Sequence, residues 1–310
     1  MIKQKTAVTI GDSIKYFLAS KKARGITEKT IHNYSQSISF FLRDMGLNDS
    51  SLISLVNDST IIGWVKMMRD KGMKVTTINH YLTDVRTFLY FCMEENYLKP
   101  FKINLMKGQA EAPKFYNDEE ISVLLKKPSS KDTFTNYRTW IVICFILATG
   151  ARASTLVNIR LSDISFSNGE VRYRHLKNKT VATVPLSSSL SKVLREYLNT
   201  WSREKEDGYL FCDMSENQCT VSSLYQSMEH YCKSRGVEHK GLHALRHSFS
   251  RLYILNGGDA FSLQRILTHK SITMTNRYVH LFADDLKKNY ESFAPLDNLT
   301  LSRQSTIHRK

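Results

Sequence analysis

The sequence predicts a protein that is mainly α-helical, with a small antiparallel β-sheet in its second half. Residues 10–100 carry apolar side chains at the spacings of three and four that mark one face of a helix. Residues 163–186 instead combine turn signals with alternating or Val- and Thr-rich runs, which favour strands. A short polar stretch, residues 101–113, lies between the two regions and is typical of a linker. We therefore expect an all-helical domain over residues 1–110 and an α+β domain over residues 114–310.

The first domain is predicted to contain three clear helices. One opens at Thr27 and is stopped by Gly46. A second begins after Ser59, ahead of two apolar pairs. A third opens at Thr76, and Pro100 ends the helical region. The buried side of this third helix consists of Ile78, Tyr81, Leu82, Val85, Phe88, Leu89, Phe91 and Cys92.

The second domain is predicted to begin with a helix and to contain the sheet near its middle. Asn117 and the three acidic residues after it favour a helix cap and an acidic first turn. An apolar helix over Trp140–Thr149 ends at Gly150. A turn signal at residues 167–170 separates two strand-like runs. After Pro185 the pattern returns to helices through to the end.

The charge of the chain indicates a polyanionic partner. The 310 residues include 44 Lys and Arg against 29 Asp and Glu, a formal net charge of +15. Residues 1–112 hold 16 basic and 10 acidic residues, and the remainder holds 28 and 19. Because both parts are basic, the pattern favours two domains that each contact nucleic acid rather than one basic tail. Charge alone describes partners and not the fold.

The cysteines argue against a disulfide framework, because their number is odd and their spacing irregular. The five are Cys92, Cys144, Cys212, Cys219 and Cys232. The last three, with His230 and His239, are an alternative zinc site, but no tight C-x₂-C pair supports it. The first residues lack a signal-peptide core and no apolar run is long enough for a membrane span. We expect a cytoplasmic protein without membrane contact.

Two short clusters each contain one cation that could bind a phosphate. Arg152 follows the predicted helix end at Gly150, where an ordinary surface arginine is the simpler interpretation. Lys177 lies in a predicted turn between two strands, and basic hairpin tips are usually only solvated. Neither cluster carries a functional assignment by itself.

Two further clusters contain histidines, an arginine and a tyrosine. His243 and Arg246 lie one turn apart and share a helix face, which makes an anion site or a pair of structural residues. His269 is followed nine residues later by Tyr278. A tyrosine at helical spacing is more often a core residue than a nucleophile.

Taken together and in this order, the clusters resemble those of the tyrosine recombinase, or phage integrase, family. The set consists of Arg152, Lys177, His243, Arg246, His269 and Tyr278. The resemblance covers about residues 114–290, and the helical first domain is similar to the core-binding domain of the family. Lys177 also stands eight residues before Pro185, as the hairpin lysine of family members precedes a similar Val-Pro-Leu.

The resemblance implies covalent catalysis by Tyr278. Its phenol oxygen would attack a phosphodiester and leave a 3′-phosphotyrosyl bond and a free 5′-hydroxyl. The transition state places extra negative charge on the non-bridging oxygens, which Arg152 and Arg246 can bind with bidentate, permanently charged groups.

Proton transfer is the task implied for the remaining residues. A tyrosine of pKa about 10 needs help to react at neutral pH, and His243 and His269 can donate hydrogen bonds or take its proton. Lys177 is the implied general acid for the leaving 5′-oxygen. The cations replace a metal and the covalent bond conserves energy, so we expect no metal, no other cofactor and no ATP.

The sequence departs from the family pattern at two positions. Many members carry Glu three residues after the first catalytic arginine, where this chain has Thr155. Many also carry Gly before the position of His269, where this chain has Thr268. The first departure puts the support of the site in question, while neither removes a residue of the catalytic set.

The favoured function is a site-specific recombinase that integrates or excises a mobile genetic element. A Xer-type resolvase of chromosome or plasmid dimers, a type IB topoisomerase-like activity and a non-catalytic DNA-binding protein are the alternatives. The expected partners are double-stranded DNA recombination sites, three further copies of the chain in a tetramer, and accessory DNA-bending or directionality factors. Apolar residues after Tyr278 would dock either on a neighbouring subunit or on their own core.

Overall fold

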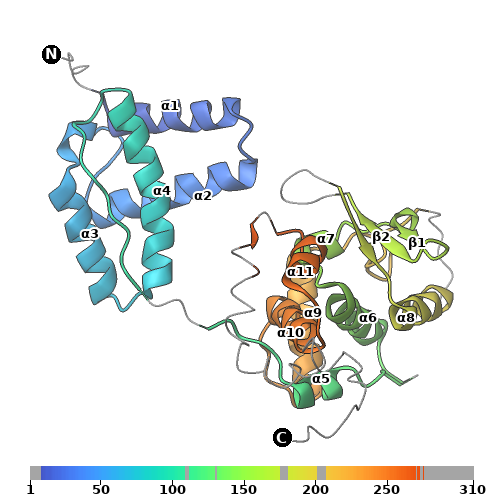
Figure 1. Ribbon diagram of the computed structural model, residues 1–310. Coiled ribbons are helices and arrows are strands. Elements are labelled where there is room, and N and C mark those ends of the chain that lie inside the picture. Colours follow the sequence, from blue (N-terminus) through green and yellow to red (C-terminus); the bar gives the residue numbers. More distant parts are fainter. Residues whose placement is uncertain are drawn as a thin grey trace, which may run out of the picture. The chain divides into compact units, whose positions relative to one another are not determined.

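The computed structural model describes residues 8–108, 112–129, 131–174, 181–200, 207–269, 271, 272 and 275. The chain separates into two compact units, Met1–Ala112 and Pro113–Lys310. Most of the described residues are helical, with one small antiparallel sheet, as the sequence predicts (Figure 1). Two residues of the expected catalytic set, Lys177 and Tyr278, lie outside the described residues.

The first unit is built around one long helix. Its elements are α1 (Ile10–Ala23), α2 (Glu28–Asp44), η1 (Ile53–Leu55), α3 (Asp58–Asp70) and α4 (Val75–Glu94). Helix α4 packs against α1, α2 and α3 (Figure 1). Aromatic rings fill the core, with Phe17 in edge contact with Phe88 and Phe41 with Trp64. The amphipathic pattern of α2 and α4 thus produces a helical bundle with one apolar interior.

Two of the predicted helix starts in this unit were misplaced. Helix α3 starts before Ser59, because Asn57 accepts a hydrogen bond from the Thr60 amide while the Thr60 hydroxyl binds the Asn57 amide. Helix α4 starts at Val75, so Thr76 lies in its first turn rather than at its cap. Both errors are of one or two residues, which is where local patterns are weakest.

The predicted linker is in part attached to the first unit. Ile103 is buried, and its amide donates to the Tyr90 hydroxyl at 3.2 Å. The backbone of Met106 exchanges two hydrogen bonds with the Asn79 side chain, at 2.8 and 2.9 Å. The stretch therefore stays against α4 as far as residue 106.

The second unit surrounds a helix that is buried on most of its sides. Its helices are α5 (Asp118–Leu124), α6 (Phe134–Thr149), α7 (Ala153–Leu156), η2 (Leu161–Asp163), α8 (Ser188–Asn199), α9 (Val221–Ser234), α10 (Leu242–Leu255) and α11 (Ala260–Ile266). Helix α6 packs against α8, α9 and α10. It starts earlier than the apolar run beginning at Trp140, because Thr133 caps a more polar first turn.

The sheet lies at one side of this unit and consists of β1 (Ile164–Ser165), β2 (Glu170–Tyr173) and β3 (Ala182–Pro185) (Figure 1). The described strands have the order β1-β2-β3 and are antiparallel, with Val171 opposite Val184. Both valines are buried in the unit's core. The buried carboxylate of Asp163 forms an ion pair with Arg174, at the end of β2. This pair fixes the base of the β2–β3 connection, to which Lys177 belongs.

Among the described residues, no helix is both long and apolar enough to cross a membrane. The five cysteines are free thiols. In the same part of the chain, no group of three or more His, Cys, Asp and Glu side chains gathers so as to hold a metal ion.

Candidate active site

A sharp helix end positions Arg152. Gly150 closes α6 with φ +64°, a left-handed conformation that favours glycine. A Cβ atom there would lie 2.6 Å from side-chain atoms of both Leu267 and Phe249. Close packing therefore also requires glycine at this position. The chain then extends through Arg152, which precedes α7, and the Arg152 Nη1 donates to the Thr268 hydroxyl at 2.9 Å.

Arg246, on α10, joins the end of α6 to the end of α11 through its hydrogen bonds. It is only 2% exposed. Its guanidinium donates to the carbonyl of Gly150 at 2.5 Å, to the carbonyl of Leu267 at 2.9 Å, and to Nε2 of His269 at 2.9 Å. These three partners are neutral, so they accept hydrogen bonds from the buried guanidinium without cancelling its positive charge. The site therefore holds a fixed cation between the end of α6 and the end of α11.

The protonation state of His269 follows from its neighbours. Arginine can only donate, so Nε2 of His269 accepts from Arg246, and the ring proton is assigned to Nδ1, which lies 2.9 Å from the Thr275 hydroxyl. Burial, and then the charges of Arg246 and Arg152, lower the pKa of His269 to about 4. His269 is therefore neutral at pH 7 in the protein without DNA.

His243 precedes Arg246 by one turn on the same helix, as the sequence predicts. Its side chain is at the exposed surface of α10, and its ring centroid lies 4.7 Å from that of His247. Although His243 reaches solvent, its partial desolvation, followed by the charges of Arg246 and Arg152, lowers its pKa below the ordinary value of 6.5. A neutral imidazole at this edge of the site can accept a proton at neutral pH.

The structure thus brings four of the six predicted residues together: Arg152, His243, Arg246 and His269. Lys177 and Tyr278 are not among the described residues, so their places in the site stay predictions. Sequence reasoning missed Thr275 as the partner of His269, and no local signal marks it.

The departure from the family pattern at Thr268 has a structural explanation. The amides of Thr268 and His269 bind the carbonyls of Arg265 and Gln264, which is a Schellman end of α11. Thr268 lies at the left-handed position of this motif with φ +52°, where glycine is favoured and a β-branched residue is strained. The hydroxyl, however, accepts the hydrogen bond from Arg152. Threonine at this position costs backbone strain, but its hydroxyl forms the hydrogen bond that orients Arg152.

We predict that Thr268→Gly separates stability from cleavage. Removing the strain should keep or raise the melting temperature, since a non-glycine left-handed residue costs about 1 kcal/mol. Losing the Arg152 contact should slow single-turnover DNA cleavage by roughly ten-fold. Thr268→Ser keeps the hydroxyl and should cleave like the wild type. Equal cleavage by the glycine variant would show that Thr268 does not orient Arg152.

We also predict that stability declines at mildly acidic pH because of His269. The folded protein keeps His269 neutral down to about pH 4, whereas the unfolded chain protonates it near 6.5. The unfolded state therefore binds more protons in this window. The free energy of unfolding is then highest above pH 6.5 and falls towards pH 4, by at most about 1.4 kcal/mol per pH unit. Denaturant unfolding of wild type and His269→Gln measures this, and the variant should have the shallower slope. Parallel slopes would count against a neutral, buried His269.

Known families match both units. The phage integrase family matches residues 114–284, and the phage integrase N-terminal SAM-like domain matches residues 14–96. The fold and these matches define the protein as a tyrosine recombinase, an enzyme class that acts on DNA. The chain belongs to the phage integrase family.

Individual relatives agree with this assignment. Tyrosine recombinase XerD of Listeria monocytogenes serotype 4b (strain F2365) is 26% identical over 288 residues, covering 88% of this chain and 94% of the relative. The fold is shared with a lambda integrase tetramer bound to a Holliday junction, with a TM-score of 0.70, 18% identity and coverage of 89% and 78%. It is also shared with the Tn1549 transposon integrase in complex with a circular intermediate DNA, with a TM-score of 0.69, 20% identity and coverage of 91% and 99%.

Proposed function

We propose that the protein is a site-specific recombinase that cuts and rejoins DNA through a covalent bond between Tyr278 and a 3′-phosphate. The observation that carries the proposal is the convergence of Arg152, Arg246 and His269. Two guanidiniums and an imidazole beside neutral hydrogen-bond partners make a preorganised site for a phosphate that gains negative charge. The test is the formation of a protein–DNA adduct at Tyr278.

In the proposed cleavage step, the Tyr278 oxygen forms a bond to phosphorus while the bond from phosphorus to the 5′-oxygen breaks. His243, neutral at pH 7, takes the phenol proton, and Lys177 protonates the leaving 5′-oxygen. Arg152 and Arg246 bind the non-bridging oxygens. One phosphate ester bond forms for each one that breaks, so the number of such bonds does not change. A 5′-hydroxyl from a second site can therefore reverse the step without water, metal or ATP.

We propose double-stranded recombination sites as the substrate and a tetramer as the active assembly. The positive charge of both parts of the chain fits binding to DNA by each unit. The lambda integrase structure supports the tetramer, since it contains a tetramer of that enzyme bound to a Holliday junction. Accessory DNA-bending or directionality factors are further partners that the same assays would test.

For the biological role, we propose integration or excision of a mobile element, and the transposon integrase with the same fold supports it. Similarity to XerD over 94% of that protein's length favours a second candidate, resolution of chromosome or plasmid dimers. Mapping the DNA ends bound covalently to the protein in its own cells separates the two roles. Ends at the borders of a discrete element support the first. Ends at one fixed chromosomal or plasmid site support the second.

Removing the C-terminal segment after residue 284, here called the tail, should distinguish a recombinase from a topoisomerase-like enzyme. Its apolar residues beyond position 284, which include Leu286, Phe293 and Leu296, lie outside the described residues, and we propose that they dock on a neighbouring subunit. Truncation after residue 284 should then leave binding of one subunit to a half-site intact and abolish strand exchange. Relaxation of supercoiled DNA would persist, because Tyr278 remains present.

Circular dichroism and thermal melting serve as the control for the truncation. A truncated protein that no longer folds would show that the tail completes its own core, contrary to docking on a neighbour. A folded truncated protein that recombines two sites at the wild-type rate would also contradict the proposal.

A further inference from the structure

Helix α10 carries His243 and Arg246 in its first two turns, yet it lacks a capping side chain of its own. Gly241 occupies the cap position with φ +86°, and no side chain there accepts the first amides of the helix. The first amides of a helix need acceptors, and an uncapped start is free to fray. The position of His243, two residues after Gly241, therefore depends on whatever holds this start.

Tyr116 holds the chain directly before this helix start. Its side chain is fully buried, and its hydroxyl oxygen accepts a hydrogen bond of 2.9 Å from the Lys240 amide, just before Gly241. The hydroxyl also lies 3.8 Å from the sulfur of Cys232, a contact in which either group can donate. Burial raises the pKa of Tyr116, so that the hydroxyl keeps its proton. The tyrosine thus anchors the residue that leads into the helix.

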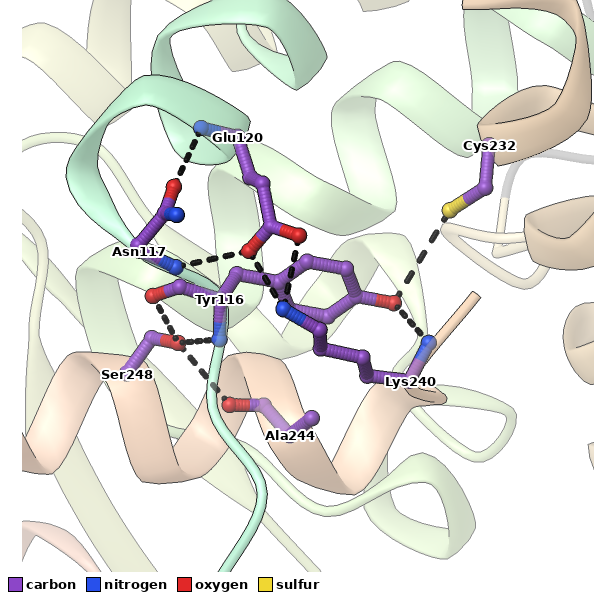
Figure 2. A network of polar contacts seen from close by, with 7 residues as sticks. All are labelled: Tyr116, Asn117, Glu120, Cys232, Lys240, Ala244 and Ser248. Atoms are coloured by element: carbon purple, nitrogen blue, oxygen red, sulfur yellow. Dashed lines mark hydrogen bonds and ion pairs between the residues drawn. The ribbon is translucent and has the colours of Figure 1, made fainter. Parts of the chain in front are cut away.

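The backbone of Tyr116 is attached to the same helix further along. Its amide donates to the Ser248 hydroxyl at 2.8 Å, and that hydroxyl lies 3.1 Å from the Tyr116 carbonyl and 3.0 Å from the Ala244 carbonyl. Figure 2 shows Tyr116 alongside α10, with contacts just before the start of the helix and at its second turn. These two points lie on either side of Arg246 in the sequence, so one residue restrains the whole segment.

An ion pair strengthens the contact at the helix start. Nζ of Lys240 lies 2.6 Å from each oxygen of the Glu120 carboxylate. That carboxylate also accepts the Asn117 amide at 2.8 Å in the capping box of α5. The starts of α5 and α10 are therefore joined by a charged contact as well as by Tyr116 (Figure 2).

We propose that Tyr116 is a positioning residue for DNA cleavage, whose hydroxyl anchors the start of α10 through Lys240 and thereby sets the places of His243 and Arg246 at the phosphate. The inference rests on the proposed function for its effect on cleavage, but the anchoring itself does not. Tyr116 lies three residues after Pro113, where the second unit begins. Tyr116, near the start of the second unit, thus fixes the helix that carries His243 and Arg246.

The test compares Tyr116→Phe with Tyr231→Phe in the full-length chain. Tyr231 is also fully buried, and its hydroxyl donates to the Leu124 carbonyl at 3.1 Å, away from α10. Both variants therefore lose one buried tyrosine hydroxyl. At a temperature where melting curves show both folded, Tyr116→Phe should cleave a nicked duplex carrying the mapped site roughly ten-fold to a hundred-fold more slowly, with unchanged DNA affinity. Tyr231→Phe should cleave at the wild-type rate. Wild-type cleavage by Tyr116→Phe, or equal slowing of both variants, would overturn the proposal.

A measurement without DNA separates this inference from the proposed function. In an NMR titration, the pKa of the His243 imidazole should move in Tyr116→Phe, because the helix start shifts, and stay unchanged in Tyr231→Phe. If the wild type forms no adduct, the proposed function fails while this titration still tests the anchoring of α10 by Tyr116. An unmoved His243 pKa in Tyr116→Phe would overturn that anchoring. Should Tyr116→Phe not fold, the part-exposed Glu120→Gln takes its place in both measurements, and wild-type behaviour in both would overturn the proposal.

Discussion

Replacing Tyr278 by phenylalanine should leave DNA binding intact and abolish the covalent adduct. The phenol oxygen is the nucleophile in the proposed step, and phenylalanine keeps the ring while removing that oxygen. Loss of a covalent nucleophile lowers the rate by about 10⁴-fold or more in comparable enzymes. Trapping on a suicide substrate, a duplex nicked beside the cleavage point, measures the adduct on denaturing gels.

The control for this substitution is Tyr290→Phe, which makes the same chemical change further along the same segment. It should form adduct at the wild-type yield. Adduct of normal yield from Tyr278→Phe would mean that a different residue attacks the phosphate. Loss of binding in that variant would instead assign the tyrosine a structural role.

Replacing Lys177 by alanine should slow cleavage by roughly 10²-fold to 10⁴-fold, the usual contribution of a general acid. Affinity should change little, because protonation of the leaving oxygen matters in the transition state and hardly in the ground state. In a substrate with sulfur at the 5′-bridging position, the leaving group departs without protonation. It should therefore restore most of the rate of Lys177→Ala.

Lys179→Ala is the matched control, because it removes a second lysine from the same connection between β2 and β3. It should cleave the ordinary substrate normally. If sulfur does not rescue Lys177→Ala, the assignment of the acid is wrong, and Lys179 becomes the first residue to test for that role.

Local sequence patterns predicted the elements that carry the site, because those patterns are set by local physics. Gly150 is required where α6 ends in a left-handed residue, and the spacing of His243 and Arg246 places both on one face of α10. The alternating runs around residues 163–186 form the sheet, in a register that places Val171 opposite Val184. In each case the signal lies within a few residues.

The contacts that hold the site together could not be predicted in this way. Arg152 and Thr268 are 116 residues apart, and Tyr116 and Ser248 are 132 apart. Such pairs exist only after helices far apart in the sequence have packed, and no periodicity encodes them. Thr268 was recognised only as a departure from a family pattern. The reason for it, a strained helix end whose hydroxyl orients an arginine, required the structure.

The proposed function depends on a covalent bond between Tyr278 and DNA, which mass spectrometry of the trapped adduct can identify. Wild-type protein trapped on the suicide duplex would be digested with protease and nuclease, and the peptide that carries a nucleotide would be sequenced. We expect one modified peptide, with a 3′-linked phosphate on the oxygen of Tyr278. A nucleotide on any other residue, or a 5′-linked phosphate on Tyr278, would contradict it.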